Sequence, residues 1–137
     1  MLSDATTFAD LRLEWDGVEQ MQKRMQTLCV VTFASGGITA HGLAKVVYNM
    51  PLLLAFSVLG ETLLAIRREG HFTGKRDHVG PLMDDAKTSL TWLDWQSLRD
   101  GVKRRNQVAH DGVLFESKQC LEDIDLVRKQ LAAWTVI

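Results

Sequence analysis

Apolar residues recur along the first third of the chain at the three- and four-residue spacing of an amphipathic helix. The stripe consists of Phe8, Leu11, Trp15, Val18, Met25 and Cys29, with Met21 and Leu28 beside it. Side chains at this spacing share one face, because an α-helix turns once every 3.6 residues. The pattern predicts one long helix over residues 8–31, with Thr7 as its N-cap.

A second long helix is predicted to begin at Asn49, after a glycine-containing loop over residues 32–42 and a short turn of helix over residues 43–48. Pro51 fits its first turn, where the missing N–H costs nothing. Apolar side chains cover almost its whole circumference: Leu52, Leu53, Leu54, Phe56, Val58 and Leu59. One partner face would not hide so much apolar surface, so we expect this helix to contribute also to a subunit interface.

The rest of the chain predicts a loop and three further helices. Residues 70–80 are polar and interrupted by glycine, which indicates an exposed loop, and Pro81 opens a short helix to residue 92. A helix over residues 94–110 has the inner stripe Trp95, Leu98, Val102 and Ala109, with Gly112 where a left-handed C-cap falls. The last helix begins at Glu116 or Ser117, and its inner face is Cys120, Ile124, Val127, Leu131 and Trp134.

The fold class follows from this periodicity. No segment alternates like a strand over a useful length, although residues 29–33 resemble one in isolation. We predict a single domain over residues 1–137, an all-α, up-and-down bundle of four to five helices. A chain of about 150 residues buries roughly 68–70% of the surface that its unfolded form exposes, so 137 residues suffice for one core.

Composition narrows the class of protein. Hydrophobic content of 46% and charged content of 24% are typical of a soluble globular domain. The net charge of -1 argues against coating nucleic acid by bulk electrostatics, although cations cluster at residues 67–68, 75–76 and 103–105. Cys29 and Cys120 have no metal or redox spacing and are expected to be buried thiols in a reducing cytoplasm. The apolar run 51–60 is shorter than the roughly 20 residues of a membrane span, so we expect no membrane segment.

Three residues near the end of the fourth predicted helix combine the chemistry of a phosphate site. Arg105 offers a planar fork of donors for phosphate oxygens, and His110 is the residue type that exchanges a proton near neutral pH. Asn106 and His110 share a face, with Arg105 about 140° from His110. Arg105 also continues the apolar stripe that contains Val102, so its guanidinium starts from the packed side and needs an anionic or hydrogen-bonding partner.

The run Arg105-Asn106-Gln107-Val108-Ala109-His110-Asp111-Gly112 resembles the signature of the HEPN superfamily (higher eukaryotes and prokaryotes nucleotide-binding). That motif is an arginine, a polar residue that is often asparagine, a few residues and then a histidine. The match includes the small residue before the histidine and the glycine shortly after it. The order of helices is similar over most of the chain, whereas the motif is the specific part of the resemblance.

The resemblance implies a metal-independent endoribonuclease that needs no cofactor and works on RNA as a homodimer with two motifs in one cleft. His110 would move a proton to or from the 2'-hydroxyl or the leaving oxygen, Arg105 would stabilise the phosphorane, and Asn106 would orient His110 or the phosphate. The products would be a 2',3'-cyclic phosphate and a 5'-hydroxyl. Such proteins often belong to toxin–antitoxin, phage-defence or RNA-processing systems, so a cognate antitoxin or regulatory protein is an expected partner.

The branch of the family that nucleotidyltransferase partners modify has a tyrosine two residues after the histidine. This chain has Gly112 at that position and its only tyrosine is Tyr48, so we do not expect that modification. Other members are non-catalytic dimeric scaffolds. In that alternative, Arg105 pairs internally with an acid such as Glu61, and the apolar second helix binds a partner.

Other residues are weaker candidates for a site. Four cations near the motif or in the 70–80 loop could contact the RNA backbone: Lys103, Arg104, Lys75 and Arg76. Glu61 either lines the cleft in support of Arg105 or faces solvent. A set of His71, Asp77, His78 and Asp84 matches no zinc pattern, so no metal is expected. Trp92 could stack on a base, whereas Trp95 belongs to the core stripe.

Overall fold

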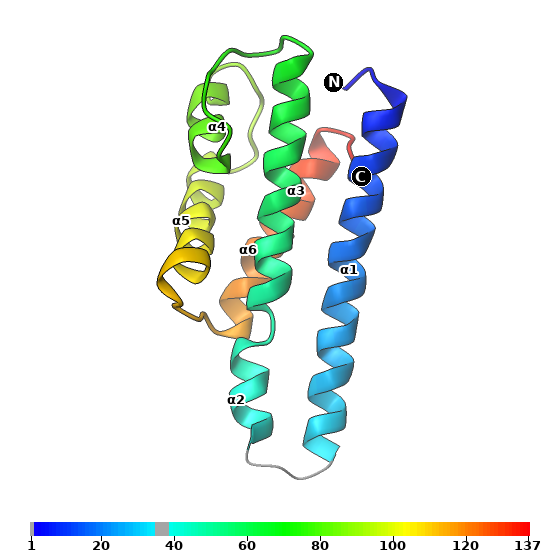
Figure 1. Ribbon diagram of the computed structural model, residues 1–137, viewed down its shortest axis with the longest axis vertical. Coiled ribbons are helices and arrows are strands. Elements are labelled where there is room, and N and C mark those ends of the chain that lie inside the picture. The colour runs from blue at the N-terminus through cyan, green and yellow to red at the C-terminus, as the bar shows by residue number, and fades with distance from the viewer. Residues whose placement is uncertain (1, 35–38) are drawn as a thin grey trace.

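The computed structural model describes residues 2–34 and 39–137, and within these ranges the fold is an all-α bundle without strands (Figure 1). The described helices are α1 (Ala5–Ala34), α2 (Thr39–Val46), α3 (Asn49–Arg68), α4 (Val79–Ala86), α5 (Trp95–Asp111) and α6 (Ser117–Ala133). The predicted fold class is therefore confirmed. The glycines at positions 36 and 37 of the predicted first loop lie outside the described residues.

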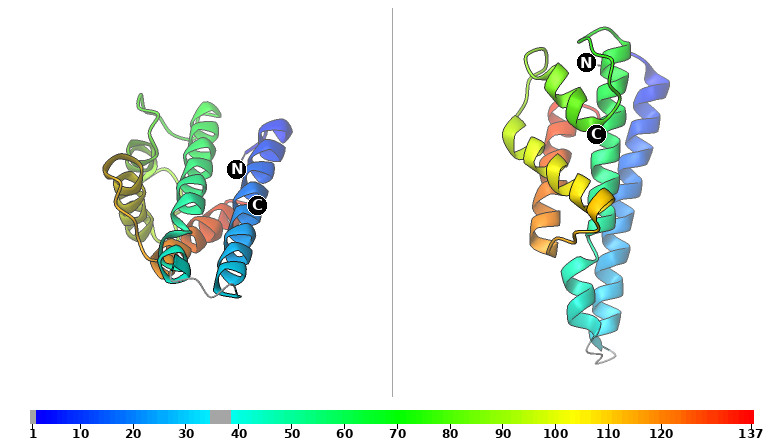
Figure 2. Two further views of the ribbon diagram at one scale, coloured as in Figure 1. Left: turned by 60° about the horizontal axis from the view of Figure 1, so that its bottom comes forward. Right: turned by 60° about the vertical axis from the view of Figure 1, so that its left-hand side comes forward.

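Helix α3 is the centre of the bundle. It packs against α1 on one side and against α4 and α5 on the other, and α6 also lies along it (Figure 2). Its buried apolar residues are Leu52, Ala55, Phe56, Val58, Leu59, Leu63, Ala65 and Ile66. Among its large apolar side chains, Met50 and Leu54 stay exposed, with 53% and 37% of their surface accessible. Helices of the same chain thus cover the apolar circumference, and a subunit interface is not needed to explain it.

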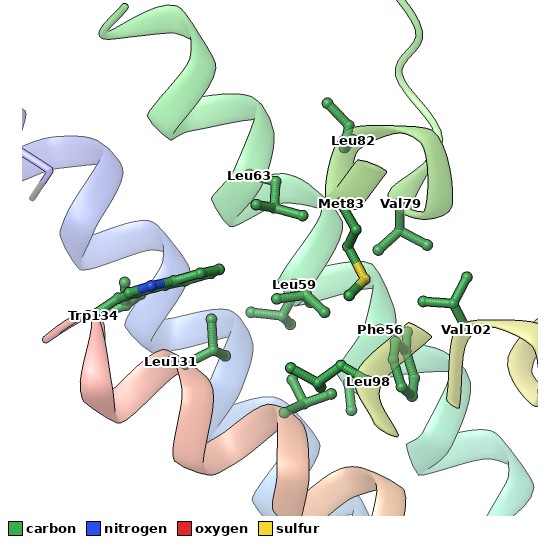
Figure 3. Packing of buried hydrophobic residues seen from close by; sticks show 14 of the residues in the cluster. Phe56, Leu59, Leu63, Val79, Leu82, Met83, Leu98, Val102, Leu131 and Trp134 are labelled. Carbon is green, nitrogen blue, oxygen red and sulfur yellow. The ribbon is translucent and has the colours of Figure 1, made fainter. Parts of the chain in front are cut away.

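The main core forms where α3 faces the second half of the chain. Phe56, Leu59 and Leu63 of α3 meet side chains of α4, α5 and α6 (Figure 3). Those partners include Leu82, Met83, Leu98, Val102, Leu131 and Trp134. Burying a side chain of this size contributes about 1.5–3 kcal/mol. This cluster therefore fixes where α4 and α5 lie relative to α3.

The first two helices differ from prediction at their ends. Helix α1 begins at Ala5 because Asp4 is its N-cap: the Thr7 backbone N–H donates to the Asp4 carboxylate at 2.9 Å. Thr7 is therefore not the cap. The helix continues to Ala34, and α2 already begins at Thr39, so the predicted loop over residues 32–42 was too long. Val30 and Val31 at the end of α1 are exposed, so apolar periodicity does not mark that end.

Helix α4 and its flanking segments also correct the prediction. The helix begins at Val79 and ends at Ala86, whereas the sequence pattern placed it from Pro81 to residue 92. Pro81 fits because the first N–H groups of a helix have no intrahelical partner. The segment after Ala86 leaves the helix, and the Trp92 indole donates to the Ala86 carbonyl at 3.4 Å. Phe72 is only 5% exposed, so the preceding loop is not wholly at the surface.

Helix α5, which carries the motif, agrees with prediction to within one residue at each end. The Asp94 carboxylate accepts from the Ser97 N–H at 2.9 Å at its start. At its end Gly112 has a φ of 66°, the left-handed conformation that glycine adopts at little cost. The predicted inner face of α6 is confirmed, since all five of its residues are buried.

One described stretch, Leu43–Arg68, is long and apolar enough to cross a membrane by length and composition alone. In the structure, 67% of its most apolar window is buried inside the bundle. Most of this stretch is α3, and the core helix of a soluble protein gives the same signal. The feature is thus accounted for by the position of α3.

Two glycines on different helices give a matched test of the close contact between α5 and α3. A Cβ on Gly101 would lie 2.6 Å from Cζ of the buried Phe56 ring, whereas one on Gly17 of α1 meets nothing within 4 Å. We expect Gly101→Ala to lower the free energy of unfolding by about 1–3 kcal/mol through overpacking. Gly17→Ala should instead raise it by about 0.5–1 kcal/mol, because alanine favours the helix. Urea unfolding checks both variants, and equal effects would contradict this packing.

The buried Cys120 thiol should be unreactive while the protein is folded. Burial, and to a lesser extent Asp123, raises the pKa of Cys120 from 9.0 to about 11. At pH 8 roughly one thiol in a thousand would be ionised, and only the thiolate reacts. A thiol reagent added to Cys29→Ser should modify no cysteine in the native protein and one in denaturant. Because the folded pKa is the higher one, the stability that this thiol contributes is present at neutral pH and falls as pH rises from 9 to 11.

Candidate functional site

An open cleft of about 370 Å³ lies where α3, the start of α4 and the end of α5 meet. All three motif residues line it: Arg105, Asn106 and His110. Glu61 of α3 and His78, which directly precedes α4, also line it. Three segments that are distant in sequence therefore bring a fixed cation, an amide, two imidazoles and the carboxylates of Glu61 and Asp77 to one hollow.

Arg105 has one polar atom without a partner. The residue is half-buried, and its Nε is the buried side-chain polar atom among the described residues that lacks a hydrogen bond. One of its terminal nitrogens donates to the Asn106 side-chain oxygen at 3.2 Å. Leaving a buried donor unpaired costs about 1–3 kcal/mol. An acceptor that enters the cleft and pairs with this N–H would recover that cost.

Asn106 and His110 lie one turn apart on α5, on the same side of the helix as the sequence predicts. The Asn106 oxygen holds the Arg105 guanidinium, so the two side chains form one unit. The His110 imidazole is exposed and makes no hydrogen bond or ion pair within the described chain. A molecule in the cleft could therefore contact it without breaking an existing hydrogen bond.

Glu61 lines the cleft but makes no ion pair with Arg105 in the described structure. It is exposed, and it also lines a second hollow between α3 and α1 that contains Glu14. Desolvation first, and then the Glu61 charge, raise the pKa of Glu14. The alternative in which Glu61 neutralises Arg105 and closes the site does not describe this geometry.

His78 is a cleft residue that sequence reasoning did not include in the phosphate site. It was weighed only as part of a metal set with His71, Asp77 and Asp84. The described residues contain no group of three or more His, Cys, Asp or Glu that could hold a metal ion. Asp77 and Asp84 pair instead with Arg67 and Arg99, at 2.5 and 3.0 Å. One sequence feature pointed to His78, namely its place just before a predicted helix start. In the structure α4 begins at Val79 and packs against α3, and His78 lines the cleft there.

Arg104 points away from the cleft into the contact between α5 and α6. Its guanidinium makes two bonds of 2.7 Å to the carboxylate of Asp123, which is 1% exposed. The hydrogen bond to Asp123 is the main cause that raises the pKa of Arg104. Arg104, expected from the sequence to contact RNA, therefore has two of its three guanidinium nitrogens engaged by Asp123.

The other three cations that were predicted to contact the RNA backbone lie at the protein surface. Lys103 is exposed and pairs with Asp100 at 2.9 Å on α5. Lys75 and Arg76 lie in the loop that leads to the cleft, and the Arg76 guanidinium is 3.7 Å from Asp85. Lys75 and Arg76 precede His78 by three and two residues, respectively. The loop cations thus adjoin one wall of the cleft, whereas Lys103 is absent from its lining.

Both tryptophans considered for base stacking are half-buried and packed against the protein. Trp92 stacks edge-on against Trp134, with ring centroids 4.9 Å apart. Trp95 donates its indole N–H to the Met83 carbonyl at 3.2 Å, and the Lys87 ammonium lies over its ring. Neither residue lines the cleft. Both contribute to the packing of α4 and of the segment that follows it.

Comparison with known proteins adds no relative: no protein-family model, no curated protein and no solved structure matches this chain.

The Arg104–Asp123 pair predicts a stability effect that distinguishes it from a surface ion pair. Arg104→Met should lower the free energy of unfolding by about 3 kcal/mol, because it leaves the Asp123 charge buried and unpaired. Adding Asp123→Asn should recover much of the lost free energy of unfolding, because it removes the buried charge. Arg128→Met breaks the exposed pair with Asp125 and should change stability by less than about 1 kcal/mol. Equal losses in the two arginine variants, measured by urea unfolding, would refute the structural role of Arg104.

Proposed function

We propose that this protein is a metal-independent endoribonuclease that cleaves RNA at the cleft between α3, α4 and α5. The observation that carries the proposal is the convergence of Arg105, Asn106 and His110 on one open hollow, with a buried guanidinium N–H that has no partner. A phosphodiester oxygen is a suitable acceptor for that donor, since arginine pairs with phosphate through parallel N–H groups. The resemblance of residues 105–112 to the HEPN signature points to the same chemistry.

The reaction uses a nucleophile that the RNA itself supplies. The 2'-oxygen attacks the adjacent phosphorus and loses its proton to a base, while the bond from phosphorus to the 5'-oxygen breaks and that oxygen gains a proton. The products are a 2',3'-cyclic phosphate and a 5'-hydroxyl. His110 carries one of the two protons, and Arg105 stabilises the charge that develops on the phosphorane oxygens. Asn106 holds the guanidinium through its side-chain oxygen.

The geometry favours catalysis over the scaffold alternative. A scaffold would close the motif with partners from its own chain, such as a pair between Arg105 and Glu61. Here His110 is exposed, Arg105 keeps an unpaired donor, and both face the same hollow. On the resemblance alone, the proposal extends to a cytoplasmic homodimer with a cognate antitoxin or regulatory protein.

The proposal is tested by cleavage of a 5'-labelled single-stranded RNA in the presence of EDTA. Wild-type protein should produce fragments that end in a cyclic phosphate, and DNA of the same sequence should remain intact because it lacks the attacking hydroxyl. Arg105→Ala and His110→Ala should each lower the rate by about 10²–10⁴-fold. Mass spectrometry of the fragments identifies the cyclic end.

Matched controls separate this site from a contaminating nuclease. Arg128→Ala and His71→Ala remove the same residue types at exposed positions outside the cleft and should cleave like wild type. Circular dichroism and thermal unfolding establish that all four variants are folded. If wild type does not cleave, or if cleavage survives both motif substitutions, the protein is not this nuclease and the scaffold alternative takes its place.

A further inference from the structure

Cleavage by 2'-hydroxyl attack requires two proton transfers, and the motif of one chain supplies one imidazole. A base must accept the proton of the 2'-hydroxyl, and an acid must protonate the departing 5'-oxygen. Both groups work best when their pKa lies near the working pH, which makes histidine the most suitable residue type. A second histidine, His78, lines the same cleft and directly precedes α4.

His78 has a free side chain on a held backbone. Its imidazole is exposed and has no hydrogen bond or ion pair within the described residues. Its carbonyl accepts from the Leu82 N–H at 3.0 Å, in the first turn of α4. A side chain in this state can meet a substrate while its own position stays defined.

The neighbours of His78 anchor it from both sides. Before it, Asp77 bonds to the Arg67 guanidinium at 2.5 Å, and Arg67 also donates to the Arg76 carbonyl at 2.7 Å. After it, Val79 is buried against α3 at Gly60. The loop is thus fastened to the end of α3, and His78 is kept at the cleft.

The charged and titratable groups that share the cleft with His78 are few. Helix α3 contributes Glu61, α5 contributes Arg105 and His110, and the loop contributes Asp77. Asp77 is engaged by Arg67, and histidine is the residue type best suited to exchange a proton near neutral pH. His71 lies outside the cleft and is 3.7 Å from Glu69. His78 is therefore the best second proton carrier in the cleft.

We propose that His78 is a catalytic residue that carries one of the two protons, with His110 carrying the other. One imidazole begins neutral and accepts the 2'-hydroxyl proton, and the other begins protonated and donates to the 5'-oxygen as its bond to phosphorus breaks. The inference rests on the proposed nuclease function. Arg105 lies on α5 with His110 and would hold the phosphate in the cleft that both imidazoles line.

The first test is the pH dependence of kcat/KM for RNA cleavage in EDTA. Wild type should give a bell-shaped profile, because one group must be neutral and the other charged. His78→Ala should lower kcat by about 10²–10⁴-fold and remove one limb of the bell. His110→Ala should remove the opposite limb. His71→Ala serves as the matched control and should keep the full wild-type profile.

The second test assigns the two roles with an RNA that has sulfur in place of the bridging 5'-oxygen at the cleaved bond. A thiolate leaves without protonation, so this substrate does not need the acid. Only one of the two variants, His78→Ala or His110→Ala, should then recover a rate within about tenfold of wild type on the same substrate. Thermal unfolding should show that both variants are folded, since both side chains are exposed.

The outcomes separate this inference from the function on which it rests. If the wild-type protein cleaves no RNA, both the nuclease function and the role of His78 are wrong. Cleavage by wild type with His78→Ala within threefold of its rate, or a slow His78→Ala that keeps both limbs, overturns the role of His78 alone. The second proton carrier would then be another group, such as His110 of a second copy. Rescue of both variants, or of neither, by the sulfur substrate contradicts the division of roles.

Discussion

The apolar surface of α3 governs the arrangement of the whole chain. Apolar side chains surround most of this helix, and water would oppose leaving any large part of them exposed. Helices α1, α4, α5 and α6 are all needed to cover it. Two of these, α4 and α5, lie side by side along it. Where α4 begins and α5 ends, backbone and polar side chains replace apolar packing, and the cleft opens there.

Close contact between α5 and α3 then sets the position of the motif. Gly101 allows the α5 backbone to approach the Phe56 ring, and Val102 packs into the same core. Arg105 follows one turn later on this packed side, so its guanidinium stem lies against protein and its Nε is cut off from water. His110 is further along, where α5 reaches its end, and is exposed. A single helix thus presents a confined cation and a solvent-accessible imidazole to one hollow.

Apolar periodicity was sufficient to predict the helices of the second half, because their inner faces are buried in one core. The inner face of α6 and the glycine cap of α5 follow from residue spacing and from one left-handed position. Of the predicted α5 stripe, Leu98 and Val102 are buried, whereas Trp95 is half-buried and Ala109 is exposed. The ends of α1 and α4 did not follow from residue spacing. Val30 and Val31 are apolar but exposed, and the end of α4 depends on the contact of Trp92 with the Ala86 carbonyl, which no local pattern reveals. Element ends without a cap or a buried stripe have no distinct sequence signal.

Prediction of the site likewise succeeded where it depended on residue spacing within one helix and failed where it depended on contacts between distant segments. That Arg105, Asn106 and His110 would lie near one another followed from helical spacing. Which of two adjacent arginines faces the cleft did not follow, because Arg104 is captured by Asp123, a residue on another helix. His78 could not be assigned to the same cleft as His110 before the path of the loop was known, and that path depends on Arg67 and Asp77.

The unpaired Arg105 donor is a local energetic cost in the folded protein. Buried polar groups in folded proteins are almost always hydrogen-bonded, so an unpaired one requires an explanation. Here Asn106 satisfies one terminal nitrogen and fixes the guanidinium plane, while Nε stays unsatisfied within the described chain. The folded protein bears this cost whether or not anything is bound. An oxygen acceptor that reached Nε would remove this cost, whereas an apolar group would not.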